Sequence, residues 1–205
     1  MIKIIASICL VYTLNLPFTA ASDVSGDEQI KLLLARPFVK AEFIKVRKLK
    51  IMTRPFKTSG KVLFLAEKGL VWETLKPLRN VLFISNSGVG QLDIETKELV
   101  KIENPVVKSA SIVFVSIISL DLGKIKKIFK IEVLELVNGV HRYKLLPKDE
   151  SIKRAIKQIE IKGKQRVEEI LILENSGDSI QVLFKNEQFE QDAFTADELK
   201  LLEMM

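Results

Sequence analysis

The sequence of 205 residues contains one cysteine, one histidine and one tryptophan. Cys9 lies inside an apolar N-terminal run and follows the bulky Ile8, so it is not expected to be a lipid attachment site. If this run is removed on export, the remaining chain has no cysteine. Disulfide bonds and thiol catalysis are then excluded, and stability has to come from the burial of apolar side chains.

The single histidine, His141, also limits the chemistry that the chain can perform. A zinc motif with two histidines cannot form, and a Ser-His-Asp set would have to use His141. This residue follows the Asn138-Gly139 turn signal, where a polar residue at a hairpin edge is the simpler interpretation. The glycine-rich segment 85–91 joins two expected strands and does not open a helix, which argues against a phosphate-binding loop. We therefore expect no enzyme, no metal and no cofactor.

The N-terminal segment has the order of a secretory signal peptide. Lys3 is followed by an apolar run from about Ile4 to Phe18 and then by small residues. The run is short for a membrane span, and the small residues fit a cleavage site. We expect residues 1–21 to be a signal peptide that is removed on export to the periplasm, leaving one domain over residues 22–205. An uncleaved anchor is the alternative.

The charge balance of the chain is basic. It carries 32 basic and 26 acidic residues, a formal net charge of +6. Its lysines occupy alternating positions of the expected strands, as at Lys45, Lys57 and Lys61, and aromatic residues are not interleaved with them. A base-stacking platform needs such aromatics, so the pattern predicts a solvated outer face and no nucleic-acid partner. Mild attraction to anionic lipid headgroups is the alternative interpretation.

A two-residue alternation of apolar and polar side chains predicts antiparallel strands along most of the chain. An amphipathic helix is expected at 27–35, and a capping box of Thr195 and Glu198 predicts a final helix. The Asn138-Gly139 pair predicts a type I′ hairpin. The expected strands are 38–51, 60–66, 70–75, 80–85, 89–94, 131–137, 140–147, 155–161, 167–174 and 179–185. The sequence thus predicts a mainly β domain of about ten antiparallel strands with a few helices.

The middle of the chain differs from this pattern. Residues 95–103 are polar and compatible with a helix, and Pro105 breaks the segment. Residues 106–122 are nearly uncharged and rich in β-branched side chains, so periodicity does not separate helix from strand there. Apolar residues between Leu122 and Phe129 recur at helical spacing among lysines, which predicts an amphipathic helix.

Short motifs in a fixed order resemble the LolA family of periplasmic lipoprotein carriers, and together they cover nearly all of the exported chain. They are Phe38 and Phe43, Ser59-Gly60 with Phe64, Gly69-Leu70-Val71-Trp72, Pro77, Val81 to Ile84, Tyr143 with Leu145 and Pro147, and Asn175 to Asp178. The resemblance implies an unclosed antiparallel β-barrel of ten to eleven strands with a helical lid insertion. In that family an arginine before the tryptophan strand latches the lid. Here Glu67 or Lys68 stands there, and neither reproduces the planar guanidinium fork.

The resemblance also implies a site, an apolar cavity under the lid. The expected cavity residues are Phe43, Leu63, Leu65, Leu70, Trp72, Phe83 and Phe184, and the expected lid residues are Ile112, Phe114, Ile117, Ile118 and Leu122. Leu70 and Trp72 share one strand face because strand side chains repeat every second residue. Two alternatives remain, since these residues also suit an ordinary core and the middle segment also suits a permanent plug.

The function that the resemblance implies is a carrier that shields the acyl chains of lipoproteins, or of related acylated lipids, and moves them from inner to outer membrane. Its partners would be acylated lipoproteins or other acyl lipids, an inner-membrane transporter and an outer-membrane receptor, with the chain as a monomer. A sixteen-carbon chain prefers an apolar site by on the order of 10 kcal/mol, so it does not cross water unaided. The alternatives are a lipid- or lipoprotein-sensing module that signals to a protein partner, and an exported hydrolase.

Overall fold

The computed structural model describes residues 39–65, 68–85, 88–103, 113–118, 122–164 and 166–205. The expected signal peptide, the helix expected at 27–35, and Ile112 lie outside the described residues. Within the described ranges, no helix is both long and apolar enough to span a membrane.

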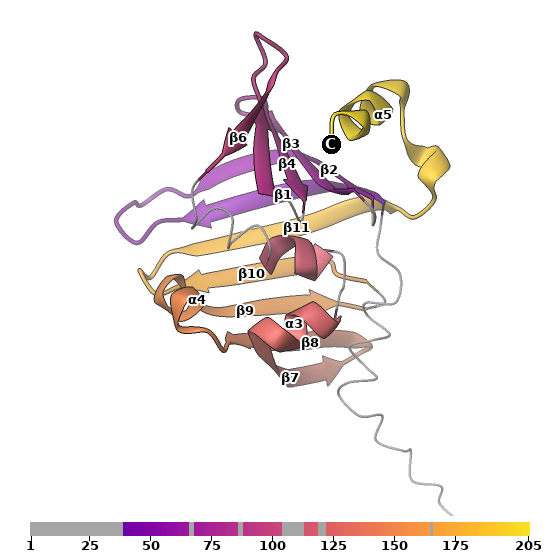
Figure 1. Ribbon diagram of the computed structural model, residues 1–205. Coiled ribbons are helices and arrows are strands. Elements are labelled where there is room, and N and C mark those ends of the chain that lie inside the picture. Colours follow the sequence, from indigo (N-terminus) through magenta and orange to yellow (C-terminus); the bar gives the residue numbers. More distant parts are fainter. Residues whose placement is uncertain (1–38, 66–67, 86–87, 104–112, 119–121, 165) are drawn as a thin grey trace, which may run out of the picture.

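Eleven antiparallel strands form one sheet in the order β6-β5-β4-β3-β2-β1-β11-β10-β9-β8-β7 (Figure 1). Their bounds are β1 Lys40–Lys48, β2 Phe56–Leu65, β3 Gly69–Lys76, β4 Asn80–Ser85, β5 Gly88–Leu92, β6 Leu99–Ile102, β7 Phe129–Val137, β8 Val140–Pro147, β9 Ile156–Gly163, β10 Glu169–Glu174 and β11 Ser179–Gln188. β6 and β7 are the edges of this order, so the sheet is not closed. This confirms the predicted fold class, a mainly β unclosed antiparallel barrel.

The sheet consists of two runs of sequential strands, β1 to β6 and β7 to β11, joined by the pairing of β1 with β11. Phe43 lies opposite Phe184 in this pairing. The β7–β8 hairpin is confirmed, with φ values of 52° at Asn138 and 74° at Gly139. Both values lie in the left-handed region that a type I′ turn requires.

One local prediction was wrong, and one helix was missed. Residues 95–103, expected to be helical, contain strand β6, which pairs with β5. The reason is Asp93, whose carboxylate accepts hydrogen bonds from the backbone N–H groups of Glu95 and Thr96 at 2.8 and 3.0 Å and turns the chain back. The sequence interpretation also missed helix α4, Glu150–Ala155, whose N-cap is Asp149.

Short helical elements cover both faces of the sheet. Residues 113–118 are helical, and α3, Leu122–Ile128, follows them as predicted. Both lie in front of the strands in Figure 1, over the lower half of the sheet. The 3₁₀ turn η1, Gln191–Ala193, leads to α5, Ala196–Glu203. The predicted capping box of Thr195 and Glu198 is confirmed, with both of its hydrogen bonds present.

The apolar side chains form two separate clusters on opposite faces of the sheet. We call the face that carries Trp72 the inner face; its cluster includes Phe43, Tyr143 and the helical segment 113–118. The outer face carries the second cluster, in which Leu63 and Val71 pack with Leu202 of α5. The middle segment therefore packs on the inner face, and the C-terminal helix packs on the outer face of β2 to β5.

Candidate functional site

Trp72 on β3 is the point where the inner face meets its cover. Its indole stacks on Phe43 of β1, with ring centroids 3.9 Å apart and an interplanar angle of 28°. Phe114 of the helical segment contacts the same indole edge-on, at 5.0 Å and 77°. Trp72 keeps 6% of its surface exposed. Aromatic contacts thus join the wall of the sheet to the middle segment.

The seven residues predicted to line one cavity do not share one face. Phe43, Leu70, Trp72 and Phe184 lie in the inner cluster. Leu63, Leu65 and Phe83 lie in the outer cluster instead, against α5, so their assignment to the same cavity was wrong. The reason is the register of β2 and β3, which places Val62 opposite Trp72 and Leu63 opposite Val71. Side chains alternate along a strand, so Val62 and Phe64 take the inner positions.

The predicted lid residues within the described part of the chain lie on the inner face. Ile117 and Ile118 are buried there, and Phe114 and Leu122 are half-buried against the same cluster. Their side chains pack against the strands, so this part of the inner face is covered by the segment.

Two surface pockets lie away from Trp72. One, with a volume of about 640 Å³, lies between β7, β8, α4 and β9 and is rich in lysine. The other, of about 500 Å³, is lined by charged and apolar residues and lies beside β10 and β11. Of the predicted cavity residues, Phe184 contributes to the lining of the second pocket and none to the first.

The inner face also carries a lysine next to its apolar centre. Lys45 follows Phe43 on the same face of β1, opposite Thr58 of β2 and Val182 of β11. Burial and, to a smaller degree, the charge of Arg47 lower the pKa of Lys45. The buried Thr58 hydroxyl has no hydrogen-bond partner within the described residues. A polar group of a bound ligand would find a cation and a hydroxyl at this position.

On the outer face, charged groups attach α5 to the sheet. The carboxylate of Glu198, which is 2% exposed, accepts hydrogen bonds from Lys40 and Lys61, each at 2.8 Å. Lys61 also lies 3.5 Å from Glu73, which pairs with Arg79 at 2.8 Å. Burial opposes the charge of Glu198, but the two ammonium groups outweigh this effect and lower its pKa to about 2.

Lys68 is one of the two residues expected where the LolA family has its latch arginine, and it binds α5. Its ammonium donates to the backbone carbonyl of Leu202 at 3.0 Å. This lysine therefore holds the C-terminal helix. Glu67, the other candidate for this position, lies outside the described residues, so its role stays a prediction.

Few groups in the described part of the chain suggest catalysis. No cluster of three or more histidine, cysteine, aspartate or glutamate side chains there is arranged to hold a metal ion. His141 lies on β8 with its Nδ1 3.3 Å from the hydroxyl of Tyr143. Burial raises the pKa of Tyr143 to about 12, so this phenol keeps its proton at neutral pH.

No protein-family model matches the sequence, and no curated protein matches it. The fold is similar to a LolA superfamily protein from Nitrosomonas europaea, with 8% identity, 83% of this chain and 96% of that chain covered, and a TM-score of 0.48. It is similar to MucB at 9% identity, 84% and 60% coverage and a TM-score of 0.47. An outer membrane lipoprotein-sorting protein domain from Vibrio parahaemolyticus matches at 12% identity, 86% and 97% coverage and a TM-score of 0.44. Solved structures with LolA-like names are thus among those that the fold resembles, as the motifs predicted. Because these TM-scores lie below 0.5, we base the proposed function on the residues of this chain.

Proposed function

We propose that the protein is an exported carrier that shields the acyl chains of lipoproteins or related acylated lipids on its inner face. The observation that carries this proposal is the junction of Phe43, Trp72 and Phe114. There one face of an open sheet packs on a helical segment of the same chain, residues 113–118. An apolar face covered by such a segment suits a ligand that replaces the cover.

The exchange of cover for ligand is energetically reasonable. Ile117, Ile118 and Phe114 occupy the place where we put the acyl chains. Burial of an aliphatic chain is worth about 0.8 kcal/mol for each methylene. The burial of a sixteen-carbon chain therefore contributes more free energy than the exposure of these few side chains costs. Trp72 and Phe43 stay shielded from water throughout, because the ligand takes over the contacts of the segment.

The polar end of the ligand also finds a place on this face. Lys45 and Thr58 lie directly opposite each other on β1 and β2, next to the apolar centre. A charged or hydrogen-bonding headgroup there would satisfy the Thr58 hydroxyl, which has no hydrogen-bond partner within the described ranges. We therefore place the acyl tails toward Trp72 and the headgroup toward Lys45.

The direction of transport, from inner to outer membrane, belongs to the same proposal. It is supported by the signal-peptide order of the N-terminal segment and by the LolA-like motifs. The implied partners are an inner-membrane transporter and an outer-membrane receptor. We also propose that residues 22–205 act as one domain, as a monomer in the periplasm.

Organic extraction tests the proposal. The exported protein is purified without detergent, and the extract is analysed by mass spectrometry for acylated species. We expect about one acylated molecule for each protein chain, and a large reduction for the Trp72→Ala variant. The Leu199→Ala variant, altered at an exposed residue of α5, serves as the control. Extracts free of acyl species, together with no uptake of added lipopeptide, would contradict the proposal.

A further inference from the structure

Large apolar side chains project into solvent at one end of the sheet. Ile51 and Met52, in the turn between β1 and β2, are 91% and 46% exposed. Leu78, in the turn between β3 and β4, is 80% exposed. Both turns lie at the same end of β2, because Arg47 pairs with Phe56 there and Lys76 with Ser59. Exposure of large apolar side chains to water is unfavourable, and a group of them at one end of the sheet suggests contact with an apolar phase.

The chain around the first turn is strongly basic. From Phe43 to Leu65 it has no acidic residue and seven basic ones: Lys45, Arg47, Lys48, Lys50, Arg54, Lys57 and Lys61. Of these, Lys48, Lys50 and Arg54 have no ion pair for their side chains within the described ranges. Apolar tips flanked by free cations are typical of a surface that meets an anionic membrane.

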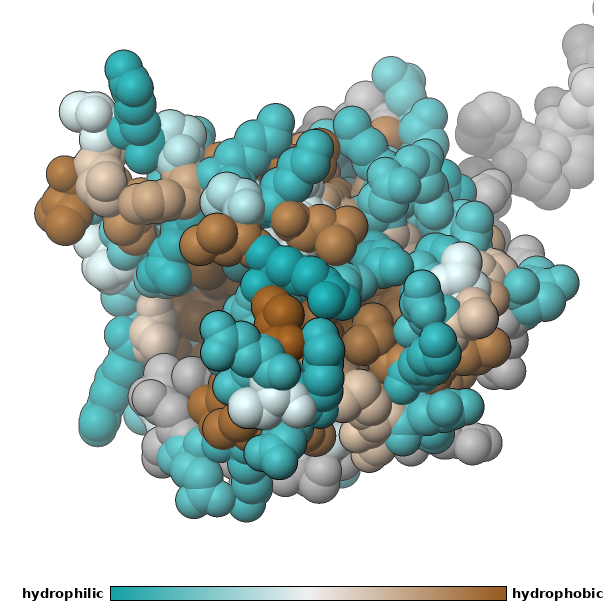
Figure 2. All heavy atoms as spheres, turned by 90° about the horizontal axis from the view of Figure 1, so that it is seen from above, coloured by the Kyte–Doolittle hydropathy of each residue, from teal (hydrophilic) through white to brown (hydrophobic). Residues whose placement is uncertain are grey.

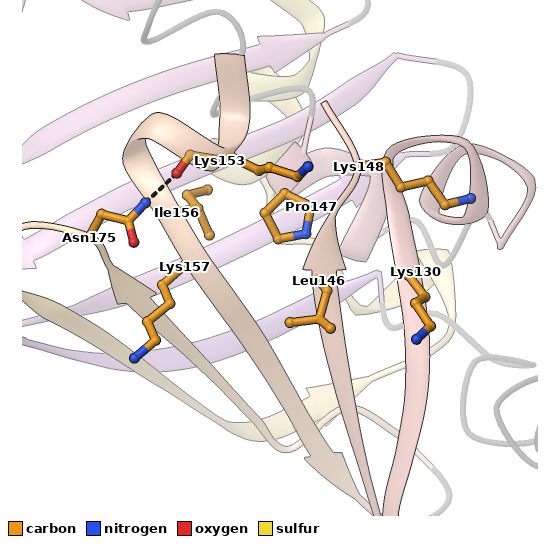
Figure 3. Close-up of a pocket in the computed structure, with 8 residues that line it drawn as sticks. All are labelled: Lys130, Leu146, Pro147, Lys148, Lys153, Ile156, Lys157 and Asn175. Carbon is orange, nitrogen blue, oxygen red and sulfur yellow. Dashed lines mark hydrogen bonds between the residues drawn. The ribbon is translucent and has the colours of Figure 1, made fainter. Parts of the chain in front are cut away.

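The lysine-rich pocket (Figure 3) is lined in part by α4, which lies near the β1–β2 turn in Figure 1. Four lysines from β7, α4, β9 and the segment before α4 border it, around an apolar centre; the lining residues are Lys130, Leu146, Pro147, Lys148, Lys153, Ile156, Lys157 and Asn175. Lys130 pairs with Glu132 at 3.0 Å and Lys153 with Glu150 at 2.6 Å. Lys157 has neither an ion pair nor a hydrogen bond for its side chain in the described part of the chain. The pocket therefore retains positive charge.

Hydrogen bonds connect the pocket to the apolar turn. Asn175 donates its side-chain amide to the carbonyl of Lys153 and its backbone N–H to the carbonyl of Ala155 at 3.0 Å. Asp178, three residues after Asn175, accepts a hydrogen bond from the backbone N–H of Lys50 at 2.9 Å. Figure 1 shows the β1–β2 turn, the β10–β11 turn and α4 together at the left end, and Figure 2 shows hydrophobic atoms at the left tip of the molecule.

Acidic side chains at this end do not cancel the positive charge. Glu174 and Asp178 face Arg47, at 3.5 and 3.9 Å. Asp149 caps α4, and its carboxylate accepts the backbone N–H of Ser151 at 2.8 Å. With Glu132 and Glu150, which pair with pocket lysines, these carboxylates are still fewer than the basic side chains of the β1–β2 turn and the pocket, so this end keeps a net positive charge.

We propose that this end of the sheet is a docking surface for anionic phospholipid bilayers. Ile51, Met52 and Leu78 enter the interfacial region, while the lysines of the pocket bind lipid phosphates. The occupant is a bilayer and not a single protein partner because the apolar tips lie in two separate turns and the cations lie in one of these turns and in the pocket, so that the contacts are spread over one end of the sheet. Such docking would place the inner face of the sheet next to the membrane that holds the ligand.

Flotation with lipid vesicles tests this surface without any cargo. The exported protein is mixed with vesicles of phosphatidylcholine, with or without 30 to 40 mol% phosphatidylglycerol (about one lipid in three). We expect binding to the anionic vesicles, and a loss of binding at high salt. Reversing Lys130 and Lys157 to glutamate should weaken partitioning at least tenfold, since each lysine near such a surface contributes about fivefold. Ile51→Ser with Met52→Ser should weaken it by a similar factor.

Matched controls separate docking from general charge and from cargo binding. The Lys101→Glu, Lys200→Glu variant makes the same charge change at exposed sites elsewhere, and Leu199→Ser removes an exposed leucine from α5. Both controls should bind vesicles like the unaltered protein. Equal binding to neutral vesicles, or equal losses in the controls, would overturn the docking surface. Acyl species in the organic extract would still support the carrier in that case, so the two proposals fail separately.

Discussion

The ring of Phe43 on β1 stacks on the indole of Trp72 on β3, although β2 lies between the two strands. Strands separated by one neighbour are about 9.5 Å apart, so both side chains must lean across β2 to bring their centroids to 3.9 Å. The residue of β2 opposite Phe43 is Gly60, which has no side chain in the way. The aromatic part of the inner face thus depends on a glycine of the intervening strand.

This relationship predicts that Gly60→Ala destabilises the protein. A Cβ atom at this position would lie 1.9 Å from the backbone oxygen of Glu73, at an irregularity in the β2–β3 pairing. Backbone has to move, and we expect a loss of about 3 kcal/mol in the free energy of unfolding, measured with urea. Ser59→Ala, at the neighbouring position, should cost less than about 1 kcal/mol. An equal loss of unfolding free energy in both variants would show that the close approach of β2 and β3 at Gly60 does not determine stability.

Trp72 allows a direct test of where the ligand binds, because it is the single tryptophan of the chain. A phospholipid or lipopeptide with a doxyl group on its acyl chain quenches an indole that it touches. If the acyl chain replaces Phe114 against Trp72, the emission should fall by more than half at saturation, and an unlabelled ligand should restore it. Tight binding without quenching would place the acyl chains away from the inner face.

The cover should open as a unit, which predicts an unusual mutational pattern for Ile117 and Ile118. In a fixed core, cutting back a buried isoleucine costs about 2 to 5 kcal/mol. If the segment detaches locally, its variants lose no more than the free energy of that opening. We expect Ile117→Ser with Ile118→Ser to cost about 2 kcal/mol and to speed hydrogen exchange in residues 113–118. Ile159→Ser, at a fully buried strand residue, is the control and should cost more. A double variant that costs at least twice the control would make the segment permanent core.

The sequence predicted the fold well where alternation was clean. The Asn138-Gly139 turn and the Thr195–Glu198 capping box are local signals, and both are present. β6 was missed because a short strand of Leu99 to Ile102 pairs on one side only and depends on the Asp93 turn. The periodicity of a sequence does not show which strands pair with each other.

The strand faces on which the expected site residues lie were predicted in part. Trp72 and Leu70 were placed on one face correctly, since they belong to a single strand. Leu63 and Phe83 were placed wrongly because the face that a strand presents depends on its register with its neighbours. The attachment of α5 by Glu198 to Lys40 and Lys61 joins residues more than 130 positions apart, and no local pattern announces it. Ion pairs between residues far apart in the sequence can be identified only from the structure.

The attachment of α5 to the sheet should depend on pH. The pKa of Glu198 falls from 4.5 to about 2 on folding, because the hydrogen bonds from Lys40 and Lys61 outweigh the opposing effect of burial. A carboxyl group whose pKa is lowered by folding stabilises the fold fully above its unfolded pKa and loses this contribution as the pH falls toward the folded value. The attachment of α5 should therefore weaken between about pH 4.5 and pH 2. At the alkaline end, Glu198 and Glu73 raise the pKa of Lys61 against the effect of burial, so its contribution is lost only above its usual range, as pH rises past 10.5. Glu198→Gln should remove the acid dependence and cost about 2 kcal/mol at pH 7, whereas Glu203→Gln on the same helix should change neither. Hydrogen exchange of α5 across this acid range measures the effect, and a profile unchanged by Glu198→Gln would mean that Leu202 and the outer cluster alone hold the helix.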